Sequence, residues 1–303
     1  MKYVITGASG NISKPLSEKL LNAGHQVTVI GRNADHLKEL VDKGAQPAIG
    51  SVDDVDFLIK TFAGADAVYI MVPPNIKVAN WKNYIAQMGG NYAKAIEANR
   101  VGHVVNLSSI GAHMADGCGP VSGLYHVEQT LNALADANIK HLRPGYFYQN
   151  LLGNIGLIKS LGIMGGNFGG PGSKLVLSNT DDIADVAADE LIHLYFAGKT
   201  VRYMASDEKN GDEIARIVGA AIGKPDLQWA VFDDQQALLG MLQAGLPEEI
   251  AKNYVEMGHA IRTGEMTADY WKHHPGHLGK RKLEDFANLF AAIYNGQGAP
   301  VHG

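Results

Sequence analysis

The chain has 303 residues, enough to bury a large core and to form one large α/β domain or a domain with a smaller lobe. Its formal net charge of -5 leaves no broad cationic surface, which argues against direct nucleic-acid binding. The single cysteine, Cys118, excludes an intrachain disulfide framework and fits a reducing compartment. No apolar run approaches the roughly 20 residues that span a bilayer, and the first residues show no signal-peptide pattern. We therefore expect a cytoplasmic protein without membrane contact.

The first thirteen residues, MKYVITGASGNIS, combine a short strand, a glycine turn and the start of a helix that we expect from Gly10 to about Ala23. Gly7 permits a tight turn, and Gly10 lets the backbone approach phosphate groups. Ser13 stands where such a fingerprint usually has a smaller residue. The amides and the positive dipole end of the helix attract phosphate. The segment predicts a dinucleotide site, and an ordinary strand–helix turn is the alternative.

The first half alternates apolar strands with amphipathic helices, which predicts a doubly wound, Rossmann-like parallel sheet. We expect strands at residues 4–6, 26–30, 46–49, 67–71, 103–107 and 140–143. The helices between them are expected at residues 14–23, 35–43, 55–62, 80–99 and 120–137. Right-handed crossovers place a ligand above the carboxyl ends of these strands, at the point where the strand order reverses.

The second half starts with glycines at 165, 166, 169, 170 and 172, which predict one mobile or sharply turned loop. A further helix is expected at 180–197 and a further strand at 200–204, followed by helices at 210–222, 234–244, 247–260 and 282–294. We expect residues 1–150, with 177–205 returning to them, to form the nucleotide-binding domain. Residues 206–303, together with the loop region 151–176, are expected to form a smaller, mainly helical lobe over the nicotinamide.

Arg32 follows the second expected strand, where such folds choose between the two nicotinamide cofactors. An acidic residue there accepts from a free ribose 2′-hydroxyl, whereas a guanidinium donates to a 2′-phosphate. The sequence therefore predicts NADP, and a solvated surface arginine is the alternative. Residues 50–54 follow the third strand, where the adenine usually lies. Val72, Pro73 and Pro74 follow the fourth strand as a rigid wall beside the cofactor or a plain stiffened loop.

Several segments together resemble the NmrA-like branch of the atypical short-chain dehydrogenase/reductases, from the first strand to about Trp229. They are TGASGNIS, VIGRN, LSSIGA at 107–112, EQTLNAL at 128–134, LRPGYFYQN at 142–150 and EIARIVGAAIGKPDLQW at 213–229. The resemblance implies a Rossmann-like domain with a small C-terminal lobe and bound NADP. It also implies that Ser108, Ser109, Pro144 and Tyr146 border the nicotinamide and the substrate. The cofactor-binding residues that we predict are Gly7, Ser9, Gly10, Asn11, Ile12, Arg32, Val72, Pro73, Ser108 and Pro144.

Related short-chain reductases protonate a carbonyl with a tyrosine whose acidity is raised by a lysine four residues later. Here Tyr125 is followed four residues later by Gln129, a neutral amide that cannot stabilise a phenolate as a cation does. Tyr125, His126 and Glu128 are expected at the start of a helix, where the imidazole of His126 is a candidate proton donor. Ser109, Tyr125 and His126 are the candidate catalytic residues. The alternative is a partly exposed helix start at which Glu128 supports the helix dipole.

Tyr146, Phe147 and Asn150 follow the sixth strand and are candidates to line the substrate pocket, although an aromatic run after a strand is often core. The segment WKHHPGH contains three histidines, but no cysteine or HExxH pattern accompanies them. We therefore expect no metal site. Acidic residues at 181, 182, 185 and 189 are interpreted as the solvated face and first turn of a helix.

The predicted function is that of an NADPH-dependent oxidoreductase of a small quinone-like or carbonyl substrate. A quinone accepts hydride without a finely tuned acid, because its reduced oxygens are weakly basic, and this matches the missing lysine. The alternative is a non-catalytic NADP(H)-binding redox sensor that passes cofactor occupancy to a regulatory protein partner. The oligomeric state does not follow from the sequence.

Overall fold

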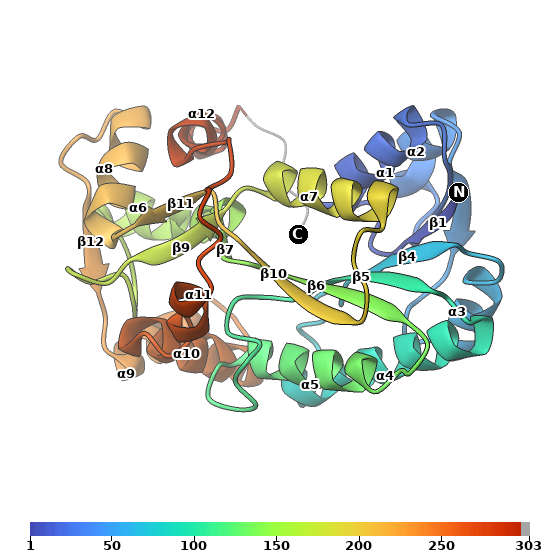
Figure 1. Cartoon of the computed structure of the whole chain (residues 1–303). Helices are drawn as coiled ribbons and strands as arrows, with labels where there is room; N and C mark the ends of the chain where they lie inside the picture. The colour runs from blue at the N-terminus through green and yellow to red at the C-terminus, as the bar shows by residue number, and fades with distance from the viewer. Residues whose placement is uncertain (298–303) are drawn as a thin grey trace.

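The computed structural model describes residues 1–297, and its largest unit is a seven-stranded parallel sheet (Figure 1). In spatial order the strands are β10 (Lys199–Met204), β6 (Asn138–Pro144), β5 (His103–Leu107), β4 (Ala67–Ile70), β1 (Lys2–Ile5), β2 (Gln26–Gly31) and β3 (Gln46–Ile49). All neighbours in this sheet are parallel. Strand β4 is buried along its whole length, which explains its unbroken apolar sequence. The strand order reverses between β1 and β4, which is where such sheets bind ligands.

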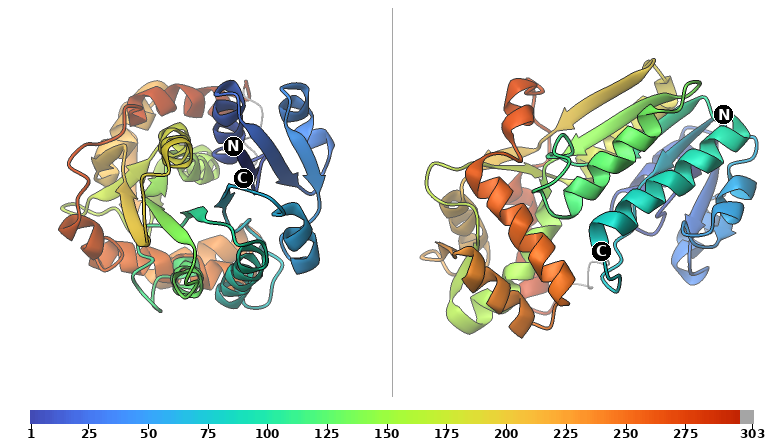
Figure 2. Two further views of the ribbon diagram at one scale, coloured as in Figure 1. Left: turned by 45° about the vertical axis from the view of Figure 1, so that its right-hand side comes forward. Right: turned by 90° about the horizontal axis from the view of Figure 1, so that it is seen from below.

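Helices cover both faces of the sheet (Figure 2). One face carries α1 (Ser13–Asn22), α2 (Lys38–Asp42) and α7 (Thr180–His193), and the other carries α3 (Val55–Thr61), α4 (Trp81–Asn99) and α5 (Pro120–Asn132). Helices α4 and α5 pack closely because each has a glycine at the contact. A Cβ on Gly89 would lie 2.9 Å from the Cα of Val127, and a Cβ on Gly123 would lie 2.7 Å from the Cβ of Ile85. This part of the chain is the doubly wound, Rossmann-like fold that the sequence predicts.

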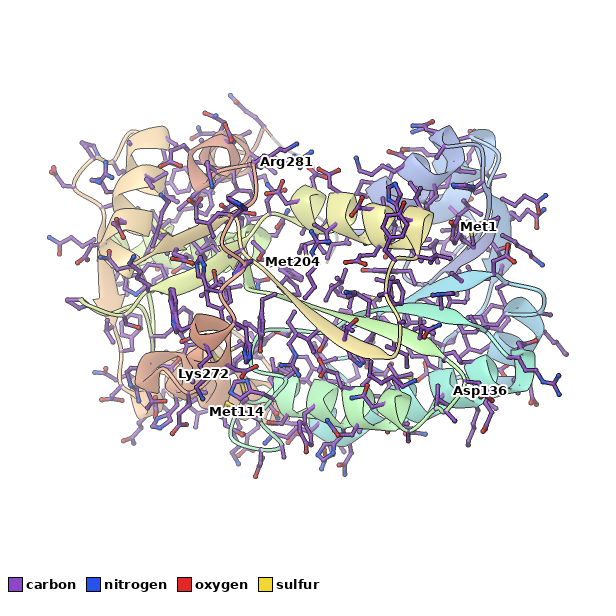
Figure 3. All side chains as sticks on the ribbon, in the orientation of Figure 1. Met1, Met114, Asp136, Met204, Lys272 and Arg281 are labelled. Carbon is purple, nitrogen blue, oxygen red and sulfur yellow. The ribbon has the colours of Figure 1, made fainter. Side chains whose placement is uncertain are left out.

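The second part of the chain lies beyond the carboxyl ends of the strands. Figure 3 shows the direction of the strands, because Asp136, just before β6, lies at the right and Met204, at the end of β10, lies near the centre. The helices here are η2 (Tyr148–Asn154), α6 (Ile155–Leu161), α8 (Gly211–Ala221), α9 (Asp234–Gln243), α10 (Glu248–Thr263), α11 (Ala268–Lys272) and α12 (Leu283–Tyr294). Their shared core includes the buried Trp229 and Phe290.

Two small sheets join these helices, and the sequence did not predict them. One contains β11 (Asp207–Lys209), β9 (Leu175–Ser178) and β7 (Tyr146–Phe147), and the other contains β12 (Gln228–Val231) and β8 (Ile163–Gly166). The region 151–176, expected to be a loop, instead holds η2, α6 and β8. Of the glycines expected in one turned loop, 165 and 166 lie in β8, whereas 169, 170 and 172 lie in the turns between β8 and β9. Some of these glycines permit close packing, since a Cβ on Gly169 would lie 2.7 Å from the indole nitrogen of Trp229 and one on Gly165 would overlap the carbonyl oxygen of Ala230.

Several expected helices differ from the observed ones at their ends, among them the helix expected at 247–260, which spans Glu248–Thr263. The helix expected at 35–43 is a 3-10 turn, η1 (Asp35–Leu37), followed by the short α2. The helix expected at 120–137 stops at Asn132, because residues 133–137 turn into β6. The helix expected at 180–197 stops at His193, because Leu194 adopts a left-handed backbone with φ of 51°. Within residues 1–297, no helix is long and apolar enough to cross a membrane.

Candidate functional site

The loop after β1 is tied to the loop after β4 at the point where the strand order reverses. The hydroxyl of Thr6 accepts a hydrogen bond from the backbone N–H of Met71 at 2.9 Å. Gly7 has φ of 63°, and a Cβ there would lie 2.6 Å from the sulfur of Met71. Only glycine therefore fits this turn, and the two loops form one connected rim.

The start of α1 fits a bound phosphate group. No side chain caps this helix and its first turn contains no acidic residue, whereas side chains cap α3, α4 and α7. A Cβ on Gly10 would meet only the carbonyl oxygen of Gly7, at 3.2 Å. Ser9 is exposed, Asn11 is half-buried and Ile12 is buried at this turn. A helix start that lacks a side-chain cap and a bulky neighbour can direct its amides and its dipole to an anion.

Arg32 is exposed directly after β2, beside the loop that follows β3. Its charge and that of Asp53 both act on the phenol of Tyr84, which places the three groups near one another. Burial and then the Asp53 carboxylate raise the pKa of Tyr84, while Arg32 opposes them. The guanidinium therefore lies at the carboxyl end of β2, where the adenosine is expected, and its role in cofactor choice stays a prediction.

The loop after β4 is held from below by α4. The hydroxyl of the buried Tyr92 donates to the carbonyl oxygen of Met71 at 2.6 Å. Val72 and Pro73 are half-buried next to this anchor, and Pro74 is exposed. Because the two prolines restrict the backbone, this loop forms a stiff wall beside the rim.

The ends of β5 and β6 come together where the nicotinamide is expected. The backbone N–H of Ser108 donates to Leu142 at 2.8 Å, and that of Ile110 donates to Pro144 at 2.9 Å. The Ser109 hydroxyl donates to the carbonyl oxygen of Ile110 at 2.9 Å. The buried Ser108 hydroxyl instead donates to Glu128 at 2.5 Å. The hydroxyl protons of Ser108 and Ser109 are therefore both used in hydrogen bonds within the protein.

Glu128 and Arg143 form a buried ion pair beneath Ser108. The Arg143 guanidinium donates to both carboxylate oxygens, at 2.9 and 2.5 Å, and to the hydroxyl of Tyr203 at 2.8 Å. Burial lowers the pKa of Arg143, but its bonds to Glu128 outweigh that effect and raise it. The expectation that Glu128 supports a helix dipole is wrong, because this residue lies in the middle of α5 and points into the protein.

Tyr125 and His126 also lie in the middle of α5 and not at its start. Tyr125 is half-buried with its ring edge-on to the exposed His126, at 5.2 Å between centroids. Neither residue lines the pocket of about 900 Å³ that lies in the second part of the chain and is described next. Their catalytic role, like that of Ser109, stays a prediction that the geometry leaves untested.

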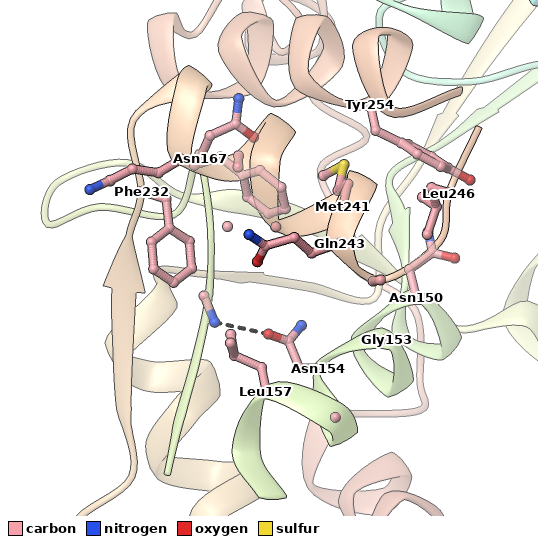
Figure 4. Close-up of a pocket in the computed structure, with 18 of the residues that line it drawn as sticks. Asn150, Gly153, Asn154, Leu157, Asn167, Phe232, Met241, Gln243, Leu246 and Tyr254 are labelled. Atoms are coloured by element: carbon pink, nitrogen blue, oxygen red, sulfur yellow. Dashed lines mark hydrogen bonds between the residues drawn. The ribbon is translucent and has the colours of Figure 1, made fainter. Parts of the chain in front are cut away.

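A pocket of about 900 Å³ lies between the η2–α6 segment and helices α9 and α10 (Figure 4). Its aromatic lining consists of Tyr146, Phe168, Phe232 and Tyr254. Besides small residues and Ser160, the wall contains amides, methionines and leucines: Asn150, Asn154, Asn167, Gln236, Gln243, Met241, Met257, Leu157, Leu161 and Leu246. The pocket can therefore hold a planar organic molecule and offer it a few hydrogen bonds.

Two of the three residues expected to line a substrate pocket do line this one. Tyr146 and Asn150 face it, whereas Phe147 packs against the core beneath α1 and α7. The two aromatic residues separate because successive side chains of a strand point to opposite faces.

Tyr254, which the sequence did not single out, faces the same pocket from α10. Its ring is held edge-on to Trp81, at 5.3 Å between centroids. Burial raises the pKa of Tyr254, and burial together with the nearby Tyr254 phenol raises the pKa of Tyr146. Both phenols therefore stay protonated at neutral pH and can donate a hydrogen bond. Nothing in the sequence indicates this role, because a tyrosine within one of several apolar helix patterns is not distinguished from a core residue.

The histidine and aspartate clusters have structural partners. His274 pairs with Glu208 at 2.6 Å, and His273 lies against Asp269. Within residues 1–297, no group of three or more histidine, cysteine or acidic side chains could hold a metal ion. The acidic face of α7 is only partly solvated, because Arg281 binds residues 182 and 185 at 2.6 and 2.8 Å.

Comparison with known proteins agrees with this geometry. Residues 7–142 match the family described as NAD(P)H-binding. The chain therefore contains an NAD(P)H-binding domain, as its resemblance to the NmrA-like, atypical short-chain dehydrogenase/reductases implies. It is 24% identical over 298 residues to an NAD(P)H azoreductase from Xenophilus azovorans, which covers 96% of this chain and 98% of the relative.

Two solved structures of oxidoreductases share the fold of this chain. An NADPH-dependent quinone oxidoreductase from Escherichia coli, in complex with NADPH, has a TM-score of 0.79 and 18% identity, covering 95% of this chain and 99% of that one. A triphenylmethane reductase from Citrobacter, in complex with NADP(H), has a TM-score of 0.78 and 22% identity, with coverage of 95% and 99%. Both likenesses extend through the second part of the chain as well as the large sheet.

Proposed function

We propose that the protein is an NADPH-dependent oxidoreductase that reduces a flat, quinone-like acceptor. The observation that carries the proposal is the aromatic pocket of about 900 Å³, which adjoins the carboxyl end of β6. Tyr146 connects the two, because it follows β6 within three residues of Arg143 and lines the pocket. The names of the relatives, a quinone oxidoreductase and an azoreductase, agree with an acceptor that is planar and aromatic.

The residues of the cleft fit a nicotinamide nucleotide. The glycine turn and the uncapped start of α1 suit the pyrophosphate, and Arg32 suits a 2′-phosphate. Ser108 and Pro144, at the adjoining ends of β5 and β6, would border the nicotinamide. When bound, the cofactor supplies a hydride; the protein orients the acceptor, keeps water out and handles the proton.

Within the pocket, we assign the proton side of the reaction to the phenols of Tyr146 and Tyr254. Each can donate a hydrogen bond to an acceptor oxygen, and their raised pKa values keep them in the donating form. A quinone needs no stronger acid, because its reduced oxygen is a weak base. Tyr125, which lacks a lysine partner and lies outside the pocket, is not required in this scheme.

The two roles, nucleotide binding and acceptor binding, belong to different parts of the chain in this proposal. We propose that residues 1–150, with 177–205, act as the nucleotide-binding domain and that 151–176 with 206–303 act as the lobe that receives the acceptor. Within the described residues, the return of β10 to the large sheet and the separate core around Trp229 support this division.

The test is steady-state consumption of NADPH with a panel of quinones, azo dyes and simple carbonyl compounds, using the purified protein. We expect quinones to be reduced and simple ketones to be poor substrates. Tight binding of NADPH without turnover of any acceptor would contradict the proposal and favour a cofactor sensor. A search for a protein that binds only the NADPH-loaded form would then follow.

A further inference from the structure

The lining of the large pocket contains no aspartate, glutamate, lysine, arginine or histidine among the described residues. Its polar atoms are the phenols of Tyr146 and Tyr254, the hydroxyl of Ser160 and a set of amides. The pocket is large enough for a multi-ring acceptor, yet it provides no ionic partner. Charge is therefore the property by which this lining can distinguish one acceptor from another.

Charged groups that adjoin lining residues are engaged in their own contacts. Arg262 donates to both oxygens of Asp234, at 2.8 and 3.1 Å, and to the backbone carbonyl of Asn167 at 2.7 Å. These bonds hold the pKa of Asp234 well below its usual range, so the pair stays ionised together. On α6, Lys159 lies over the ring of Tyr294, at 5.2 Å. None of these side chains lines the pocket.

An ionised group that enters such a pocket gives up its hydration without gaining a counter-ion, which is strongly unfavourable. A neutral ring system gains from leaving water and from contact with aromatic side chains. A neutral carbonyl oxygen can also accept hydrogen bonds from the phenols and from Asn150. The lining thus favours neutral acceptors over ionised ones.

We infer that the pocket selects uncharged, planar aromatic acceptors and rejects anionic ones, such as sulfonated or carboxylated rings and phosphate-bearing substrates. The inference rests on the proposed function for the chemistry, but the selection itself is a property of binding. It can therefore be measured with or without turnover.

The experiment compares a naphthoquinone with its ring-sulfonated derivative as electron acceptors, and a naphthol with its naphthol sulfonate as ligands that need no reduction. Binding is followed by fluorescence in the presence of NADPH. For the wild type we expect kcat/KM and affinity to be about tenfold or more lower for the sulfonated member of each pair. Equal values within each pair would overturn the inference.

A matched pair of lysine variants on α9 locates the effect. Gln243 lines the pocket (Figure 4), whereas Gln235 is exposed on the same helix and does not line it. Gln243→Lys adds a cation to the wall, so we expect the discrimination against the sulfonate to shrink about fivefold or more. Gln235→Lys adds the same charge outside the pocket and should leave the wild-type ratio unchanged. Equal changes in both variants would assign the effect to the overall field and overturn the inference.

The two readouts separate this inference from the proposed function. If the naphthol binds better than its sulfonate but no quinone is reduced, the charge selection stands and the oxidoreductase assignment fails. If both quinones are reduced equally well and both naphthols bind equally, the oxidoreductase assignment stands and the selection fails.

Discussion

The two ends of the candidate site are built in different ways. The nucleotide end comes from short continuous segments, such as residues 6–13, and it uses backbone atoms of turns that only glycine permits. The acceptor end comes from segments about a hundred residues apart, and its surface consists largely of side chains on η2, α6, α9 and α10. Changes of backbone shape should therefore abolish nucleotide binding, whereas single side-chain changes should tune the acceptor end by smaller steps.

The largest effect is expected at the glycine turn. Gly10→Val should weaken NADPH binding by about 100-fold or more, because its branches extend beyond a Cβ that already lies 3.2 Å from the Gly7 oxygen, into the phosphate path. Titration by calorimetry checks the affinity, and circular dichroism checks that the variant folds. Gly90→Val on α4 is the control, because a Cβ there meets nothing within 4 Å. Unchanged NADPH affinity in folded Gly10→Val would refute the nucleotide assignment.

The next largest effect is expected at Arg32, the single side chain proposed to determine the choice between NADPH and NADH. A charge-assisted contact to a 2′-phosphate contributes about 1.5–3 kcal/mol, so Arg32→Ala should weaken NADPH by roughly 10- to 150-fold and NADH little. Arg32→Asp should go further and invert the preference, because a carboxylate repels the phosphate and accepts from a free hydroxyl. Fluorescence titration of both cofactors decides the matter.

Two results would count against this role of Arg32. The wild type could bind NADH as tightly as NADPH, or Arg32→Ala could weaken both cofactors equally. In either case Arg32 does not determine the choice between NADPH and NADH. Arg216→Ala is a suitable control, since Arg216 is exposed on α8, away from the cleft.

At the acceptor end, a single hydroxyl should matter less. Tyr254→Phe keeps the ring packed on Trp81 but removes the donor, so kcat/KM for a naphthoquinone should fall about tenfold, equivalent to roughly 1.4 kcal/mol. The affinity for NADPH should not change, because the hydroxyl lies in the acceptor pocket. Steady-state kinetics with a parallel cofactor titration measures both quantities. A Tyr254→Phe enzyme with wild-type kcat/KM would remove Tyr254 from the mechanism.

The smallest effect is expected for Tyr125→Phe. Tyr125 lies outside the pocket and has no lysine partner, so quinone reduction should stay well within tenfold of the wild type. The same assay measures it, with Tyr254→Phe as the reference. A loss of several orders of magnitude at constant cofactor affinity would make Tyr125 the proton donor and would contradict the comparison between the two ends.

Sequence patterns located the elements of the large sheet well, because each strand and helix there carries its own apolar period. The strands at 46–49 and 103–107 have the expected bounds, and the errors lie at the ends of elements. The strand expected at 140–143 spans Asn138–Pro144, and the helix expected at 180–197 ends before the left-handed Leu194. Short strands such as β8 and β12 were missed, since their hydrogen-bond partners lie far along the chain. Glu128 was misread for the same reason, because its partner Arg143 comes from another element.

The sequence by itself determined the nucleotide end. A glycine turn between a strand and a helix is a local structure, so the residues that its backbone conformation requires are consecutive in the sequence. The doubly wound fold and the NAD(P)H-binding family follow from that local pattern. Only the tertiary structure decided the acceptor end. It turned Tyr146 and Phe147 to opposite sides of β7 and brought Tyr254 to face Tyr146, because packing of distant segments, and no local propensity, determines which side chains share a cavity.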